Sequence, residues 1–92
     1  MPLLNNEQVT EKLAGLPLWQ LAAPNIERTL TFADFPAAIA FVNRIAEAAE
    51  QANHHPDIDI RWNKVRLALS SHDAGGLTER DFLLAAAIDS LV

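Results

Sequence analysis

The chain has 92 residues, of which 50% are hydrophobic and 21% are charged. We expect residues 1–92 to form a single small domain, and this length excludes a separate cofactor-binding domain. The formal net charge of −5 argues against direct binding of nucleic acid, and the absence of cysteine excludes disulfides and thiolate chemistry. Without a signal-peptide pattern or an apolar run near the roughly 18 residues of a membrane span, we expect a cytoplasmic protein with no membrane association.

The first half of the chain predicts a helix, a hairpin and a longer helix. Asn5 or Asn6 can cap the first helix. Two short runs of alternating apolar and polar residues flank a Pro-Asn turn signal, which predicts a hairpin at about residues 18–32. Asp34 is a good N-cap for the longest helix, whose apolar stripe ends at Asn53.

The second half predicts another hairpin and a last helix. Residues 57–71 alternate on both sides of Asn63-Lys64, which we expect to form the tight turn, and Trp62 is expected on the sheet face or in the core. Thr78 can cap a helix over about residues 79–91.

These elements follow one another in the order α-β-β-α-β-β-α. Each predicted strand has one apolar face, and the helices have apolar stripes that can cover it. We therefore expect an α+β fold, with a four-stranded antiparallel sheet and the helices packed on one face. The last helix is apolar nearly all round, and its surplus apolar surface is either a subunit interface or a set of exposed alanines.

The three histidines all flank the second hairpin. His54 and His55 precede it and His72 follows it, so pairing of its strands would bring them to one edge of the sheet. Imidazole titrates near pH 6.5 and can both give and take a proton at neutral pH, so a cluster would suit acid–base chemistry. Glu50 lies one helical turn before His54 and could orient it. The alternative is three unrelated surface histidines.

A metal site is the competing chemical interpretation. Three histidines together with Glu50, Asp57 or Asp73 would satisfy zinc by residue type. However, the side chains of His54 and His55 diverge, and neither His-x-x-x-His nor His-Glu-x-x-His spacing occurs. We expect no metal.

Three segments are distinctive when taken together. They are Asn53-His54-His55-Pro56-Asp57, Trp62-Asn63-Lys64-Val65, and the run Leu-Ser-Ser-His-Asp-Ala-Gly-Gly-Leu-Thr-Glu-Arg-Asp-Phe from Leu69 to Phe82. In these motifs the chain resembles the pterin-4a-carbinolamine dehydratase family, and its length and element order match over nearly the whole chain.

The resemblance implies an activity and an assembly. The substrate would be a 4a-hydroxytetrahydropterin, formed by aromatic amino-acid hydroxylases, and loss of water would give the quinonoid dihydropterin. The family uses no metal or organic cofactor, and its members form homodimers or homotetramers partly through helices. A non-catalytic interaction or dimerisation partner of the same family is the alternative function.

The resemblance also implies roles for individual residues. His54 and His72 would be the catalytic pair, and His55 would position the pterin beside them. Residues that would contact the substrate are His54, His55, Pro56, Ser71, His72, Asp73 and Ala74. Glu50 and Asp81 match acidic positions that support the histidines. The chain departs from some members at Asn53, where they have Asp, and at Ile58, where they have an aromatic residue.

Overall fold

A computed structural model describes residues 2–92 of the chain and has the α+β architecture that the sequence predicts. The elements in chain order are α1 (Asn6–Ala14), β1 (Gln20–Ala22), β2 (Asn25–Thr31), α2 (Phe35–Ala52), β3 (Asp57–Arg61), β4 (Lys64–Leu69) and α3 (Glu79–Asp89). None of the helices within residues 2–92 has the length and apolarity that crossing a bilayer requires.

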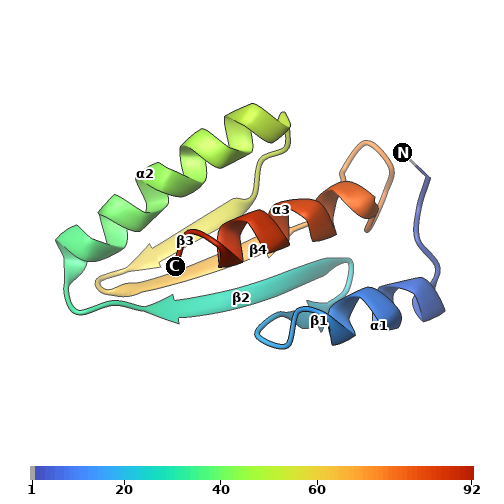
Figure 1. The fold of residues 1–92 in the computed structure, drawn as a ribbon, viewed down its shortest axis with the longest axis horizontal. Helices are drawn as coiled ribbons and strands as arrows, with labels where there is room; N and C mark the ends of the chain where they lie inside the picture. The colour runs from blue at the N-terminus through green and yellow to red at the C-terminus, as the bar shows by residue number, and fades with distance from the viewer. Residues whose placement is uncertain (1) are drawn as a thin grey trace.

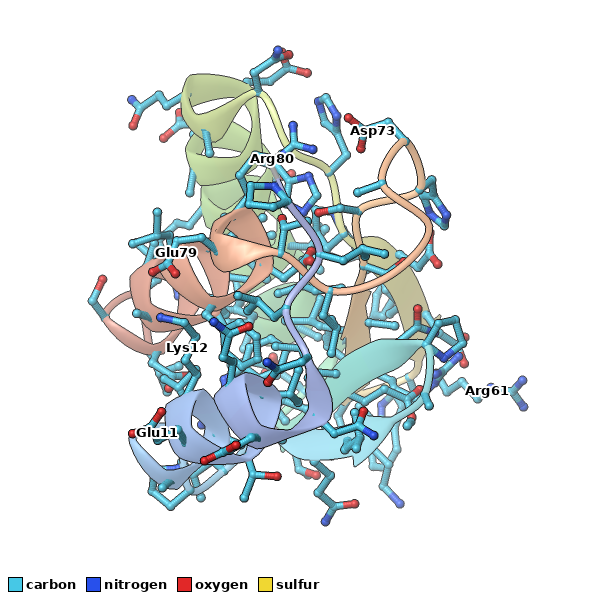
Figure 2. The ribbon with its side chains drawn as sticks, turned by 90° about the vertical axis from the view of Figure 1, so that its right-hand side faces the viewer. Glu11, Lys12, Arg61, Asp73, Glu79 and Arg80 are labelled. Carbon is cyan, nitrogen blue, oxygen red and sulfur yellow. The ribbon has the colours of Figure 1, made fainter. Side chains whose placement is uncertain are left out.

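The four strands form one antiparallel sheet in the order β1-β2-β4-β3. The helices cover one face of this sheet, and Figure 2 shows them on one side of the molecule with the strands on the other. Alternation along β2 and β4 sends every second side chain into the space between sheet and helices, as the sequence pattern predicts. The fully buried side chains there include Ile26, Phe41, Ile45, Val65, Leu67, Leu69, Leu84 and Ile88.

The helix N-termini follow the predicted caps. The side chain of Asn5 accepts a hydrogen bond from the backbone N–H of Gln8, and that of Asp34 accepts one from Ala37. Each bond satisfies a donor that the first turn of a helix leaves unpaired. Lys12 and Glu79 form a 2.8 Å ion pair that joins α1 to α3 (Figure 2).

The second hairpin turns one residue earlier than predicted. The turn residues are Trp62 and Asn63, and Lys64 already belongs to β4. Asn63 is held inward because its side-chain amide donates to the carbonyl of Phe32 at 2.8 Å and its own carbonyl accepts from the Phe32 N–H at 2.8 Å. Trp62 therefore faces outward with 69% of its surface exposed, and the expectation of a core or sheet-face tryptophan is wrong for it.

One end of the molecule collects the elements that carry the histidines. The end of α2, the loop after β4 and the start of α3 all lie there, opposite the β3–β4 turn (Figure 1).

Candidate active site

The end of α2 determines where His54 and His55 lie. Asn53 has the left-handed backbone conformation, with φ of 51°, and its N–H bonds to the carbonyl of Glu50. The next N–H, that of His54, bonds to the carbonyl of Ala49 at 3.1 Å. This pair of bonds is the Schellman ending of a helix, and asparagine is one of the few residues other than glycine that tolerates it. The chain therefore leaves the helix sharply, and both histidines follow the bend.

A closed loop after β4 carries His72 and Asp73. The N–H of Ser71 bonds to the carbonyl of Gly76 at 2.8 Å, and the carbonyl of Ser71 accepts from the backbone of Ala74 at 3.0 Å and Gly75 at 3.0 Å. Gly75 has a φ of 82°, which an L side chain rarely adopts. The loop is thus fixed at its base, and His72 is presented at its exposed side.

The three histidines border one cleft of about 330 Å³, as the hairpin topology predicts. Its lining residues are Asn53, His54, His55, Ser70, His72, Asp73 and Arg80. The volume lies within the roughly 300–1,000 Å³ of small-molecule sites. No group of three or more His, Asp or Glu side chains in the described chain, residues 2–92, is arranged to hold a metal ion.

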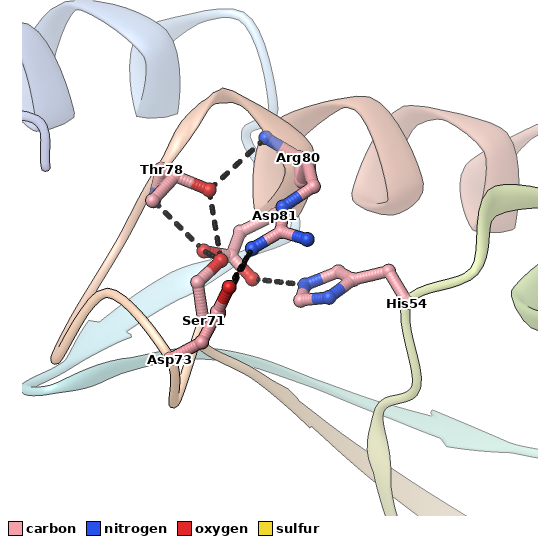
Figure 3. A network of polar contacts seen from close by, with 6 residues as sticks. All are labelled: His54, Ser71, Asp73, Thr78, Arg80 and Asp81. Carbon is pink, nitrogen blue, oxygen red and sulfur yellow. Dashed lines mark hydrogen bonds and ion pairs between the residues drawn. The ribbon is translucent and has the colours of Figure 1, made fainter. Parts of the chain in front are cut away.

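His54 is held from behind by Asp81. Its Nε2 lies 2.6 Å from Oδ1 of Asp81, and the Asp81 side chain is fully buried (Figure 3). Asp81 stands three residues after the N-cap Thr78, so its other oxygen, Oδ2, accepts the Thr78 N–H at 2.9 Å in the capping box. Ser71 Oγ donates to the same Oδ2 at 3.0 Å. The buried carboxylate therefore has partners at both oxygens, which a buried charge requires.

Glu50 lies beside His55 and not beside His54. Its Oε1 is 3.1 Å from Nε2 of His55, and both side chains are exposed. The expectation that Glu50 orients His54 is wrong, because the left-handed Asn53 ends the helical spacing on which it relied. An exposed pair of this kind contributes little to stability.

Arg80 is a cleft residue that the sequence did not single out. Its Nη2 bonds to both oxygens of Asp73, at 2.9 and 3.0 Å, and so ties the His72 loop to the first turn of α3. The hydrogen bond from the Arg80 guanidinium lowers the pKa of Asp73 below its ordinary value. An isolated arginine in the first turn of a helix gives no sequence signal that would separate it from a solvated one.

The remaining predicted residues do not all face the cleft. Pro56 and Ala74 are half-buried outside its lining, and Ser71 is fully buried. Ser70, the residue directly after β4, lines the cleft instead.

An apolar groove adjoins the cleft between α2 and α3. It has a volume of about 240 Å³, and its lining residues are Ala48, Ala52, His54, Arg80, Leu83, Leu84 and Ala87. His54 and Arg80 border both spaces, so they form the boundary between a polar and an apolar compartment.

Known proteins resemble this chain over its whole length. The sequence profile of the family described as pterin 4 alpha carbinolamine dehydratase matches residues 2–91. A relative from Acidobacterium capsulatum, provisionally named as a pterin-4-alpha-carbinolamine dehydratase, is 62% identical over 92 residues and covers 100% of both chains. A relative of the same provisional name from Chloroflexus aurantiacus is 60% identical and covers 100% of this chain and 99% of its own.

Two solved structures share the fold. A Brucella melitensis protein described as a transcriptional coactivator/pterin dehydratase matches with a TM-score of 0.90 and 31% identity over 96% of both chains. A pterin dehydratase-like protein, described as a RuBisCO assembly factor in the alpha-carboxysome, matches with a TM-score of 0.64 over 79% of this chain and 84% of its own. At 24% identity the second likeness shows the fold alone.

Proposed function

The chain belongs to the pterin-4-alpha-carbinolamine dehydratase family, and from that premise we propose that its histidine cleft dehydrates a 4a-hydroxytetrahydropterin by general acid–base catalysis. The observation that carries the proposal is the convergence of His54, His55 and His72 on one cleft, with His54 bonded to a buried carboxylate.

The conversion of the substrate needs two proton transfers. One group gives a proton to the hydroxyl at C4a, and the C4a–O bond breaks to release water. Another group takes the proton from N5, and a double bond forms between N5 and C4a. The number of protons on the enzyme is unchanged, and the starting state returns when a proton passes from the group that took one to the group that gave one, directly or by exchange with solvent. Two imidazoles near neutral pH suit this exchange.

The environments of the histidines support different roles. His54 is 8% exposed and is fixed by Asp81, whereas His55 and His72 are exposed. We assign His54 and His72 to the proton transfers, and His55 to positioning the pterin ring. Asp73 at the cleft would help to hold the substrate, and the expected contacts from Pro56 and Ala74 would come from their backbone groups.

Ser71 does not have a free group to offer a ligand. Its N–H and carbonyl are used inside the closed loop, and its hydroxyl is used by Asp81 and Thr78. Ser70 lines the cleft and Ser71 does not, so we favour Ser70 as the serine that contacts the substrate.

Self-association and a physiological partner are part of the proposal. The exposed Leu83 on α3 borders the apolar groove, which supports assembly of a homodimer or homotetramer through this helix. Sedimentation equilibrium tests it, and a monomer would contradict it. By family likeness, the substrate would come from an aromatic amino-acid hydroxylase and the product would return to tetrahydropterin.

The test is a dehydration assay with the purified protein. The 4a-carbinolamine is generated in situ and its ultraviolet decay is followed. We expect a decay rate that rises in proportion to protein concentration above the uncatalysed rate. If the folded protein gives no acceleration, the non-catalytic interaction function is favoured, and recovery of a stoichiometric partner by pull-down becomes the deciding experiment.

A further inference from the structure

Two buried hydroxyls lie behind the cleft, where no substrate can reach them. Ser71 and Thr78 are both fully buried, and their oxygens are 2.8 Å apart. We propose that these hydroxyls are positioning groups that fix which ring nitrogen of His54 exchanges protons with the substrate, an inference that rests on the dehydratase function proposed above.

The hydrogen bonds at Asp81 leave its two oxygens with different partners. Oδ2 of Asp81 accepts two hydrogen bonds, from the Thr78 N–H at 2.9 Å and from the Ser71 hydroxyl at 3.0 Å. An amide N–H can only donate, and a carboxylate oxygen that accepts two donors has no place for a proton of its own. Oδ2 is therefore unprotonated and acts only as an acceptor, while Oδ1 forms the hydrogen bond with His54 (Figure 3).

The direction of the hydroxyl chain follows from counting donors and acceptors. Ser71 has one hydroxyl proton, which it donates in the hydrogen bond to Oδ2 of Asp81. Ser71 must then accept from the hydroxyl of Thr78, whose own oxygen accepts the N–H of Arg80 at 3.3 Å. The hydroxyls of Ser71 and Thr78 thus each donate one hydrogen bond and accept one, so neither is left unsatisfied.

The carboxylate then determines the tautomer of His54. If Nε2 carried no proton, two lone pairs would face each other across 2.6 Å, which is unfavourable. Because imidazole is a stronger base than a carboxylate, the shared proton stays on Nε2.

Nδ1 is consequently the nitrogen that serves the cleft. Within residues 2–92 it makes no hydrogen bond, and it is not among the buried side-chain atoms that lack a partner, which are Asn63 Oδ1 and Arg80 Nε. It therefore keeps access to solvent in a residue that lines the cleft. Neutral His54 can accept a proton at Nδ1 and return it, while Nε2 keeps its proton throughout.

Nitrogen-15 NMR of the imidazole rings tests the tautomer directly in the intact wild-type protein. We expect neutral His54 to show a protonated Nε2 and a bare Nδ1. A protonated Nδ1 in the neutral wild-type ring would overturn the inference.

The Asp81→Asn variant should show the opposite tautomer of His54 in the same nitrogen-15 NMR measurement. The Thr78 N–H requires an acceptor, so the oxygen of the introduced amide must face it and the NH₂ group must face His54. Nε2 would then have to accept, and the proton would move to Nδ1. We expect the NMR signature to switch and kcat to fall while pterin still binds. An unchanged tautomer in the folded variant would contradict the inference.

Ser71→Ala tests the hydroxyl chain itself, with Ser90→Ala as the matched control. Ser90 is exposed, and within residues 2–92 its hydroxyl bonds only to the carbonyl of Ala87 at the far end of α3. Because one of the two donors at Oδ2 is lost, we expect Ser71→Ala to lower kcat on the order of tenfold, with little change in KM. Equal kinetics for the two folded variants, with the same His54 tautomer, would overturn the role of Ser71.

These outcomes are separable from the fate of the proposed function. The tautomer of His54 is measured without substrate, whereas the wild-type dehydration rate reports on the function. A wild-type protein with protonated Nε2 but no turnover supports the positioning network and refutes the dehydratase assignment.

Discussion

His54 and Asp81 meet across the gap between two helices: Nε2 of one lies 2.6 Å from Oδ1 of the other, although they are 27 residues apart in sequence. The carboxylate also closes the capping box of α3. One side chain thus stabilises the start of a helix and supports the histidine at the end of another.

Loss of this carboxylate should destabilise the fold. Asp81→Ala would remove the partner of His54, leave the Thr78 N–H unsatisfied and break the cap, so we expect a loss of about 3–5 kcal/mol in the free energy of unfolding. Urea denaturation followed by circular dichroism measures it. Glu79→Ala, in the same turn but with a partly exposed ion pair, should cost no more than about 1 kcal/mol. Equal losses in the two variants would argue against the buried network.

His54 and His55 should separate kinetically. Removal of a positioned acid or base lowers turnover by about 10²–10⁴-fold, so we expect His54→Ala to reduce kcat in this range. His55→Ala should mainly raise KM, because the exposed ring holds substrate and does not transfer its protons. Steady-state kinetics on folded variants distinguishes them. The opposite pattern, with kcat lost in His55→Ala alone, would require the roles to be exchanged.

The link between Arg80 and Asp73 should be visible in a pH titration. Because the guanidinium lowers the pKa of Asp73, the carboxylate keeps its charge to a lower pH than an ordinary aspartate does. The contribution of its ion pair to stability is therefore present at neutral pH and is lost as pH falls through the lowered pKa. In Arg80→Gln we expect the pKa of Asp73 to rise toward the ordinary 3.8. Carbon-13 NMR of the carboxyl groups measures the shift. An unchanged Asp73 titration would contradict the assignment of Arg80 as its partner.

The left-handed conformation of Asn53 at the end of α2 predicts that glycine is better tolerated there than alanine. Asn53→Gly should preserve stability, whereas Asn53→Ala should cost about 1 kcal/mol, because a Cβ without a polar group is strained at a φ of 51°. Gln51→Ala, exposed in the same turn, should change stability by less than about 0.5 kcal/mol. Urea unfolding compares all three. If the glycine variant is as unstable as the alanine variant, backbone strain is not the cause.

Local signals predicted most of the fold. Asn5, Asp34 and Thr78 each cap a helix as expected, since their short polar side chains satisfy the free N–H groups of the first turn. Alternation placed both hairpins, and hairpin pairing brought His54 and His72 to one cleft. These properties depend on neighbours in sequence or on simple strand pairing.

Contacts that depend on a single backbone conformation could not be predicted in this way. Helical spacing assigned Glu50 to His54, but the left-handed Asn53 redirects the chain and Glu50 meets His55. Likewise, the sequence does not specify which of Ser70 and Ser71 lines the cleft, because both follow the last residue of β4 and the geometry of the loop decides between them.

The most direct measurement of the central claim is the dehydration rate of wild-type protein beside that of His72→Ala. His72 is exposed at the cleft and has no buried partner within residues 2–92, so its removal should leave the fold intact. We predict that the wild-type protein accelerates decay of the 4a-carbinolamine and that His72→Ala loses about 10²–10⁴-fold in kcat. A folded His72→Ala protein that turns over substrate at the wild-type rate would contradict catalysis by this histidine cleft.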